Sequence, residues 1–265
     1  MSRKITECDK ELAFNLMEQA YNLGSREIGF YMVGEPFLKK DLAEFVAHSK
    51  KIGYTYTYIT TNGALATLNR MKEVINAGLD SIKFSINAAT RESYMKVHGK
   101  DDFETVKNNV NNLHDYLKQN HIELAVFISF IRTTITTNEV SILHNEFSHL
   151  VDNIYVFDAA SQGTPMFELV KGKIVSPEIY LKTSSNICDM VFNRIHITSE
   201  GYLDACCVDF DNVLNAVDLH KTSLADAWNS EVMQDLRQRF LTNNLEGMAC
   251  YNCIHKIDEP IKPLI

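Results

Sequence analysis

Hydrophobic and polar residues alternate along the first 160 residues in the pattern of strands separated by single helices. Short apolar or β-branched runs, which are typical of strands buried in a parallel sheet, recur at residues 28–34, 54–60, 82–86, 124–131 and 154–157. Apolar residues at helical spacing precede and separate these runs, at residues 7–24, 42–52, 68–79, 103–117 and 140–150. Strands joined by single helices form βαβ units with right-handed crossovers, so the pattern predicts a five-stranded parallel sheet in a chain that begins with a helix.

The periodic pattern ends near residue 157. Between Gly163 and Pro177 neither period is visible, and glycines and prolines interrupt the chain. This interruption predicts a domain boundary. We therefore expect two domains, one over residues 1–165 and a smaller α+β domain over residues 180–265.

The second domain starts with a predicted hairpin. Residues 192–206 alternate between apolar and polar side chains, with Ser199-Glu200-Gly201 at the turn. Residues 224–240 then place apolar side chains on one face of a single predicted helix. A domain of this size has little core of its own, so we expect it to depend on a further source of stability.

Composition and charge exclude several classes of protein. The 265 residues contain 26 Lys and Arg against 34 Asp and Glu, which gives a net charge of −8 at pH 7 and disfavours a nucleic-acid partner. The sequence contains no run of eighteen apolar residues, and residues 1–10 lack the apolar segment of a secretory signal. We therefore expect a cytoplasmic protein with no membrane partner.

Polar residues follow three of the predicted strands directly. They are Gly34-Glu35-Pro36, Thr61-Asn62-Gly63 and Ser85-Ile86-Asn87. Because the carboxyl ends of parallel strands meet at one edge of the sheet, these segments predict a binding site at that edge. Asn62 and Ser85 are also common turn and cap residues, which leaves a purely structural role open for both.

Five of the six cysteines lie after residue 187. Cys250-x2-Cys253 is compact enough for both thiolates to bind one metal centre, and Cys188 and Cys206 flank the predicted hairpin. Four converging thiolates are the ligand set of a zinc site or of a [4Fe–4S] cluster. A structural zinc site more often uses two short Cys-x2-Cys pairs. The wide spacing of Cys188 and Cys206 therefore makes a zinc site less favoured without excluding it.

Two further interpretations of the cysteines stay open. They can be reduced thiols without a metal, because a cytosolic chain keeps most thiols reduced, or Cys250-x2-Cys253 can be redox-active. Cys207, beside a predicted ligand, and Cys8, at the start of a helix, receive no role. We expect His98 and His196 to be surface histidines or hydrogen-bonded core histidines.

With these residues in view, the chain resembles a radical S-adenosylmethionine (SAM) enzyme with a C-terminal SPASM/Twitch-type auxiliary cluster domain. Gly34-Glu35-Pro36 resembles the family's Gly-Gly-Glu-Pro motif, with Val33 in place of the first glycine. Thr61-Asn62-Gly63 and Ser85-Ile86-Asn87 resemble its next two strand-end motifs, and residues 94–103 resemble its Tyr-x-x-Ile-Arg-Gly-x-x-x-Phe, with histidine in place of arginine. The resemblance implies a partial (β/α)6 barrel truncated at its first strand. It also implies a set of cofactor-binding residues, namely Gly34, Glu35, Pro36, Thr61, Asn62, Ser85 and Asn87.

The C-terminal third carries the more specific part of the resemblance. Its cysteines, Gly201, Trp228 and Leu236-Arg237 follow the order of the family's auxiliary domain. No cysteine follows Cys253, so the chain is similar to the shorter Twitch version with one auxiliary [4Fe–4S] cluster. The resemblance implies as its metal ligands Cys188, Cys206, Cys250 and Cys253.

The sequence departs from the family in one respect. The Cys-x3-Cys-x2-Cys loop that holds the SAM-cleaving cluster is absent from the printed sequence, and we expect it upstream of Met1 if the chain is a fragment. The second [4Fe–4S] cluster and SAM are expected only with that segment. A natural chain that has lost radical chemistry is the other interpretation.

The resemblance also implies a function. Similar enzymes abstract a hydrogen atom from the substrate, and the auxiliary cluster accepts the resulting electron, which converts a hydroxyl into a carbonyl. We expect an oxidoreductase for a small polar substrate such as a sugar or cyclitol, with a peptide as second choice and flavodoxin or ferredoxin as reductant. The alternative is a non-catalytic iron–sulfur or zinc-binding scaffold or partner protein.

Overall fold

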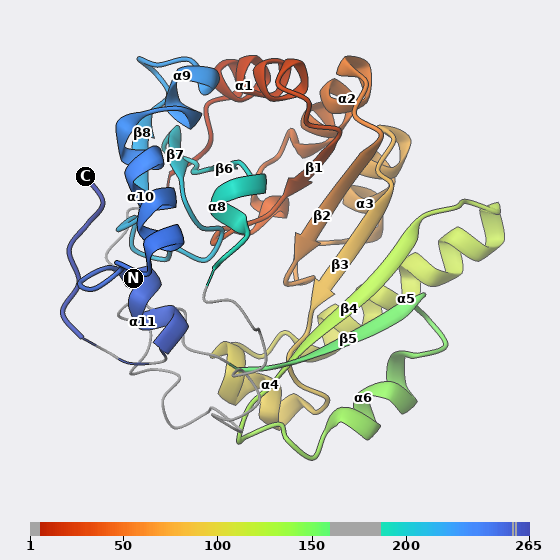
Figure 1. Ribbon diagram of the computed structural model, residues 1–265. Coiled ribbons are helices and arrows are strands. Elements are labelled where there is room, and N and C mark those ends of the chain that lie inside the picture. The colour runs from red at the N-terminus through yellow and green to blue at the C-terminus, as the bar shows by residue number, and fades with distance from the viewer. Residues whose placement is uncertain (1–5, 160–186, 256, 258) are drawn as a thin grey trace. The chain divides into compact units, whose positions relative to one another are not determined.

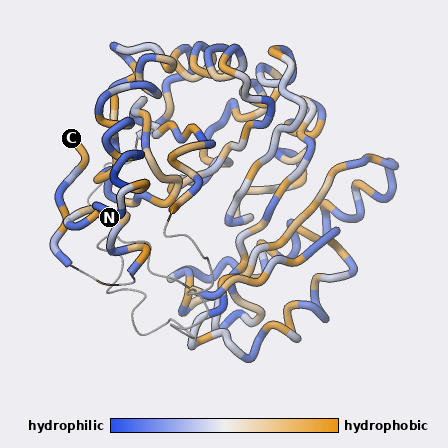
Figure 2. Tube along the Cα trace, in the orientation of Figure 1, coloured by the Kyte–Doolittle hydropathy of each residue, from blue (hydrophilic) through white to orange (hydrophobic). Residues whose placement is uncertain are grey.

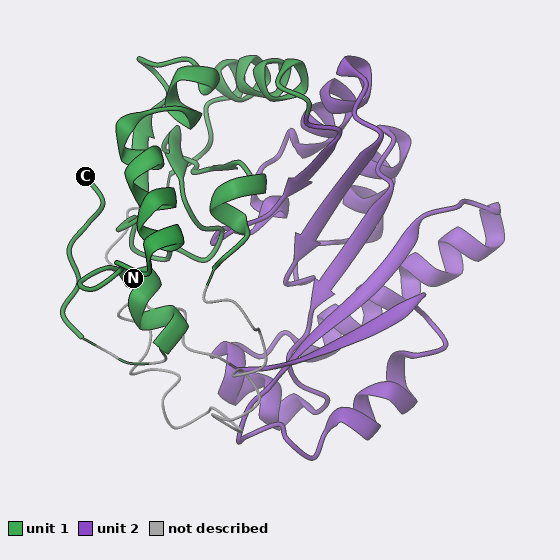
Figure 3. Ribbon diagram, viewed as in Figure 1, with its two compact units in different colours: residues 1–24, 160–172, 176–265 green, residues 25–159, 173–175 purple. Residues whose placement is uncertain are grey.

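A computed structural model describes residues 6–159, 187–255, 257 and 259–265. These residues form two compact units (Figure 3). We call residues 25–159 the sheet unit. The described residues of 1–24 and 187–265 form the second, which we call the cysteine unit. The predicted boundary between residues 165 and 180 lies outside the described residues.

The sheet unit contains a parallel sheet in the strand order β1-β2-β3-β4-β5, which confirms the predicted α/β architecture (Figure 1). Every neighbouring pair is parallel, and the carboxyl ends of the strands therefore share one edge. The first strand ends four residues earlier than predicted, because the chain turns at Met32, whose φ is 128°. The strands are β1 (Glu27–Phe30), β2 (Tyr56–Thr61), β3 (Ser81–Ser85), β4 (Ala125–Arg132) and β5 (Asn153–Asp158).

The predicted helices between the strands are present, and the structure adds two that the sequence analysis missed, the short η1 (Pro36–Leu38) and α4 (Arg91–His98). Helix α4 begins with a capping box, in which the side chains of Thr90 and Ser93 each bond the backbone of the other. Its exposed face is mostly polar, so it lacks the apolar stripe by which the predicted helices were found. The remaining helices of the unit are α2 (Leu42–Ile52), α3 (Leu68–Asn76), α5 (Phe103–Asn120) and α6 (Val140–Phe147).

The core of the sheet unit lies between the helices and one face of the sheet. Ile59, Phe84 and Phe130 on the strands are completely buried, as are Met71 and Leu113 on the helices. In Figure 2 the tube alternates between hydrophobic and hydrophilic colours along α5, as expected for a helix with one buried face. No described helix combines the length and hydropathy that a bilayer crossing requires.

Gly63 is a glycine of the sheet unit at which packing and backbone both exclude a side chain. Its φ is +84°, and an added Cβ would lie 2.9 Å from carbon atoms of Phe84 and Val106. We expect Gly63→Ala to lower the free energy of unfolding by roughly 2–5 kcal/mol, since strain and overpacking each cost about 1–3 kcal/mol. The matched control is Gly99→Ala, with φ +68° and open space around the Cβ, for which we expect about 1 kcal/mol. Urea unfolding measures both, and equal losses would refute the packing argument.

The cysteine unit combines an antiparallel sheet with short helices. Helix α1 (Lys10–Asn22) packs its buried Leu16 and Ala20 against Leu203 and Leu224 of the C-terminal segment, and Figure 1 shows α1 beside α9. The backbone amide of Leu224 donates to Gln19 Oε1 at 2.7 Å. Apart from α1, the elements are α8 (Met190–Asn193), β6 (His196–Ile197), β7 (Tyr202–Asp204), β8 (Asn215–Asp218), α9 (Leu224–Trp228), α10 (Glu231–Thr242) and α11 (Ala249–His255).

Two expectations for this unit differ from the structure. The single helix predicted over residues 224–240 is divided at Asn229 and Ser230, because Asn229 caps the end of α9 and the Ser230 hydroxyl accepts from the Met233 amide at the start of α10. The predicted hairpin is present as β6 and β7, and β8 adds a third strand that the sequence analysis missed.

Candidate functional site

The first two strand-end motifs are joined through the Glu35 carboxylate. Thr61 Oγ1 donates to Glu35 Oε1 at 2.6 Å, and the Asn62 amide donates to Oε2 at 2.8 Å. Glu35 Oε1 also accepts from the Phe37 amide at 3.1 Å and so caps η1. The structure therefore brings together Glu35, Thr61 and Asn62, with Gly34 and Pro36 on either side of the carboxylate.

The loop after β2 is fixed by polar groups as well. Asn62 Oδ1 accepts from the Ala64 amide, and Thr61 Oγ1 accepts from the Gly63 amide. Asn109, buried on α5, donates from Nδ2 to the Gly63 carbonyl at 2.8 Å. The sequence analysis missed Asn109, although an asparagine within an apolar helical stripe was a signal that could have found it. Buried polar groups that are fully paired hold a loop in one conformation.

Ser85 and Asn87 form a second group, bonded to β4 and not to Glu35. Ser85 Oγ lies 3.2 Å from Ser129 Oγ, at the register where these two residues are paired. Asn87 has φ +56°, and its Oδ1 accepts from the Ile131 amide at 2.9 Å. Thr61 pairs with Phe84 in the sheet, so both groups stand at the same edge.

His98, which takes the place of the family's arginine, is bonded to the end of β3. Its Nε2 lies 2.7 Å from the Ile86 carbonyl, and its ring stacks on Tyr94 with centroids 4.2 Å apart. Burial lowers the pKa of His98, and it raises the pKa of Tyr94 to about 12. The expectation of a hydrogen-bonded core histidine fits His98.

The lowered pKa of His98 makes the sheet unit sensitive to acid. Because the unfolded chain takes up this proton at a higher pH than the folded chain, stability falls as the pH drops below about 6.5. We expect His98→Gln to reduce the fall of the urea midpoint between pH 7.5 and pH 5.5. His149→Gln, at an exposed position of the same unit, is the control and leaves the fall unchanged. An identical fall in all three proteins would contradict the assignment.

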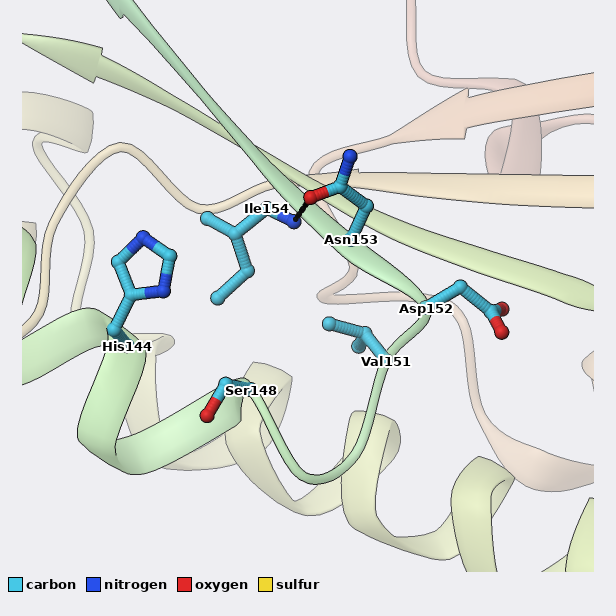
Figure 4. Close-up of a pocket in the computed structure, with 6 residues that line it drawn as sticks. All are labelled: His144, Ser148, Val151, Asp152, Asn153 and Ile154. Carbon is cyan, nitrogen blue, oxygen red and sulfur yellow. Dashed lines mark hydrogen bonds between the residues drawn. The ribbon is translucent and has the colours of Figure 1, made fainter.

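A pocket in the sheet unit lies away from these motifs. His144, Ser148, Val151, Asp152, Asn153 and Ile154 line it (Figure 4). These residues belong to the end of α6 and the amino end of β5, whereas the motif residues follow the carboxyl ends of β1, β2 and β3. It is therefore not the predicted site.

A carboxylate that the sequence analysis missed holds the start of α4. Glu139 Oε2 accepts from the Ala89 amide at 2.7 Å and from Ser93 Oγ at 2.8 Å. No sequence signal marks Glu139, because it bonds to a segment fifty residues away. Its contact links the loop after β3, which carries Asn87, to the start of α6.

In the cysteine unit, the predicted metal ligands belong to one neighbourhood. Cys188, Cys206 and Cys250 pack against the same hydrophobic cluster, whose buried members include Val191 and Leu236. Cys250 and Cys253 lie three positions apart on α11, where they share one face of the helix. The six cysteines, all among the described residues, form no disulfide.

The thiols influence one another electrostatically. Burial, followed by the charges of Cys253 and Cys188, raises the pKa of Cys250 to about 12. Burial also raises the pKa of Cys188 and of Cys253. A hydrogen bond from Cys206 to Cys207, followed by burial, raises the pKa of Cys206, and the same bond lowers that of Cys207. All four predicted ligands therefore disfavour the thiolate form when no cation is near.

These residues fit a thiolate-bound metal in their chemistry. Iron or zinc stabilises the thiolate and reverses the effect of burial, and soft thiolates are the ligands of iron–sulfur clusters and of zinc. Among the described residues no three His, Cys, Asp or Glu side chains already stand in a metal-binding arrangement. The quartet is thus a neighbourhood of thiols, and its role as a ligand set stays a prediction.

His196 differs from what the sequence led us to expect. It is 6% exposed, and neither ring nitrogen makes a hydrogen bond, although the ring is near enough to Cys207 to lower the pKa of that thiol. It is therefore neither a surface histidine nor a hydrogen-bonded core histidine. No feature of the sequence indicates an unpaired imidazole.

Comparison with known proteins supports both halves of the assignment. Residues 2–143 match the radical SAM superfamily, and residues 188–254 match SPASM, the iron–sulfur cluster-binding domain. A protein of Saccharolobus islandicus (strain Y.N.15.51 / Yellowstone #2) named "Probable GTP 3',8-cyclase" is 26% identical over 230 residues, 76% of this chain and 73% of that protein.

Three solved structures share the fold at low identity. BtrN in complex with AdoMet and 2-DOIA has a TM-score of 0.58 and 18% identity, over 95% of this chain and 82% of its own. AnSMEcpe with bound AdoMet has a TM-score of 0.62 and 14% identity, over 91% of this chain and 75% of its own. Streptococcus suis SuiB bound to the precursor peptide SuiA has a TM-score of 0.64 and 12% identity, over 89% of this chain and 61% of its own. The chain belongs to the radical SAM superfamily and carries a SPASM iron–sulfur cluster-binding domain.

Proposed function

We propose that this protein is a radical SAM oxidoreductase that acts on a small polar substrate, such as a sugar or cyclitol. The observation that carries the proposal is the Glu35 carboxylate, held at the strand ends by Thr61 and Asn62. Two motifs twenty-six residues apart meet in this one group, as a shared binding site requires. A carboxylate fixed by three donors keeps lone pairs for a ligand cation.

In this proposal the sheet unit binds SAM and the substrate, and the cysteine unit binds the auxiliary cluster. Glu35 would hold the ammonium group of SAM, and Asn62, Ser85 and Asn87 would shape the site beside it. Cys188, Cys206, Cys250 and Cys253 would hold the auxiliary cluster, in the shorter Twitch form. When bound, SAM and the iron–sulfur clusters supply the radical and one-electron chemistry that protein side chains lack, with flavodoxin or ferredoxin as reductant.

The polarity of the sheet supports a hydroxyl-rich substrate. Lys83 and Ser85 lie on one face of β3, opposite the buried Ile82 and Phe84. Ser129 joins Ser85 on the neighbouring strand. Hydroxyl and ammonium groups form hydrogen bonds with the hydroxyls of a polyol. Among proteins of this fold, BtrN binds AdoMet together with the small molecule 2-DOIA.

The second candidate function is a non-catalytic iron–sulfur or zinc-binding partner, which needs only the thiols of the cysteine unit. Nucleotide and peptide substrates are further alternatives, since relatives carry the name GTP 3',8-cyclase and SuiB binds a precursor peptide.

Product analysis tests the proposal. Protein expressed from its complete gene is reconstituted anaerobically with iron and sulfide and incubated with SAM, dithionite and a panel of polyols, GTP and peptides. We expect 5′-deoxyadenosine together with a polyol product two mass units lighter. Turnover of GTP or a peptide alone would correct the substrate class. An iron-loaded protein that forms no 5′-deoxyadenosine would support the non-catalytic alternative and overturn the enzyme.

A further inference from the structure

His196 is a buried donor without an acceptor. It lies on β6 with 6% of its surface exposed, and both Nδ1 and Nε2 are buried and make no hydrogen bond. An imidazole carries at least one N–H in either protonation state, so one donor always needs a partner. An unsatisfied buried donor is costly, which indicates a group that completes the site.

Strand pairing connects His196 to the predicted cluster ligands. His196 stands opposite Asp204 of β7, and Asp204 stands opposite Asn215 of β8, so the three buried polar residues form one row across the sheet. Asp204 Oδ1 accepts from the Cys206 amide at 2.8 Å. Asp204, the middle residue of this row, therefore joins it to the backbone of a predicted ligand.

The nature of the missing acceptor follows from the surroundings. The His196 ring is close to the Cys207 thiol, and that thiol is hydrogen-bonded to Cys206. Asn215 also keeps a buried Oδ1 without a partner, but Asn215 lies on β8, two strands away from His196 and beyond Asp204. Sulfur atoms of thiolates and of cluster sulfides accept N–H bonds, and such bonds help to set cluster potentials.

We propose that His196 donates a hydrogen bond to a sulfur of the auxiliary cluster and raises its reduction potential. The inference rests on the proposed cluster at Cys188, Cys206, Cys250 and Cys253. An N–H bond stabilises the more negative, reduced state of the cluster more than the oxidised state. His196 is thus a positioning and tuning residue that adjusts how readily this centre accepts an electron.

Redox titration of cluster-loaded variants, followed by electron paramagnetic resonance (EPR), tests this role. We expect His196→Leu to lower the reduced-to-oxidised ratio at a fixed potential about tenfold, which is about 59 mV for one electron. His196→Asn or His196→Gln restores part of the shift, because one of the two amides places an N–H near the position of Nδ1 or Nε2. His220→Leu is the matched control, since His220 in the same unit is half-exposed and paired with Asp218. It leaves the potential unchanged.

Pulsed EPR of the protein labelled with ¹⁵N-histidine gives a second, spectroscopic test, in which the coupling is recorded in the unsubstituted protein and assigned with His196→Gln. A weak nitrogen coupling that His196→Gln removes supports the hydrogen bond. A strong coupling, typical of an iron–nitrogen bond, or no coupling at all would overturn it, as would equal potentials in His196→Leu and the unsubstituted protein. Iron content separates this inference from the proposed function, because a protein that binds no iron refutes the cluster itself, whereas an iron-loaded protein with no coupling refutes only the role of His196.

Discussion

Replacing Cys250 and Cys253 together by alanine is expected to remove the iron from the protein and to loosen residues 187–265. The two thiols share one face of α11 and lie in the same neighbourhood as Cys188 and Cys206. Loss of two ligands leaves too few thiolates for the auxiliary cubane cluster, so the iron content falls by about four atoms per chain. Metal binding contributes directly to folding in small domains, so the unit then unfolds at lower urea.

Iron analysis and limited proteolysis measure this result. Cys8→Ala is the matched control, because Cys8 precedes α1 and has no predicted part in the ligand set; it retains the iron. If the double variant kept its iron and its resistance to protease, Cys250 and Cys253 would not be ligands.

The second large effect is expected at Glu35. Glu35→Gln removes the negative charge that we assign to the ammonium group of SAM, and the new amide can no longer accept with both oxygens from Thr61 and Asn62. We expect SAM to bind about tenfold to one hundredfold more weakly, as for the loss of a charge-assisted hydrogen bond. Equilibrium dialysis under anaerobic conditions measures this binding.

Glu139→Gln is the control for a general effect on the sheet unit. Glu139 is a carboxylate that also accepts several bonds, but it caps α4 and has no part in the proposed SAM site. It is expected to lower stability while leaving the affinity for SAM unchanged. Equal affinity for SAM in Glu35→Gln and the unsubstituted protein would refute the assigned role of Glu35.

The repetitive part of the fold could be predicted from the sequence because its signals are local. Each strand of the sheet is a short apolar run, and the helices between them bury one face, as Val106 and Leu113 do on α5. The elements that were missed lack such a signal. Helix α4 depends on the capping box of Thr90 and Ser93, and β8 consists of the short segment Asn215–Asp218 with no clear alternation.

The candidate site could be predicted as a set of residues but not as a set of contacts. Parallel strands place Glu35, Thr61 and Ser85 at one edge, and this much follows from topology. The contacts depend on distances between separate segments of the chain. Glu35 bonds to Thr61 and Asn62, whereas Ser85 bonds to Ser129. The unpaired ring of His196 depends on the register of three strands and could not be predicted from any one of them.

Metal and sulfide analysis of the anaerobically purified protein, combined with EPR of its reduced form, tests the central claim most directly. The proposed ligand set predicts about four irons and four sulfides for the auxiliary cluster of each chain, with a signal typical of a reduced [4Fe–4S] cluster. One zinc per chain, with no iron and no visible charge-transfer absorption, would contradict it.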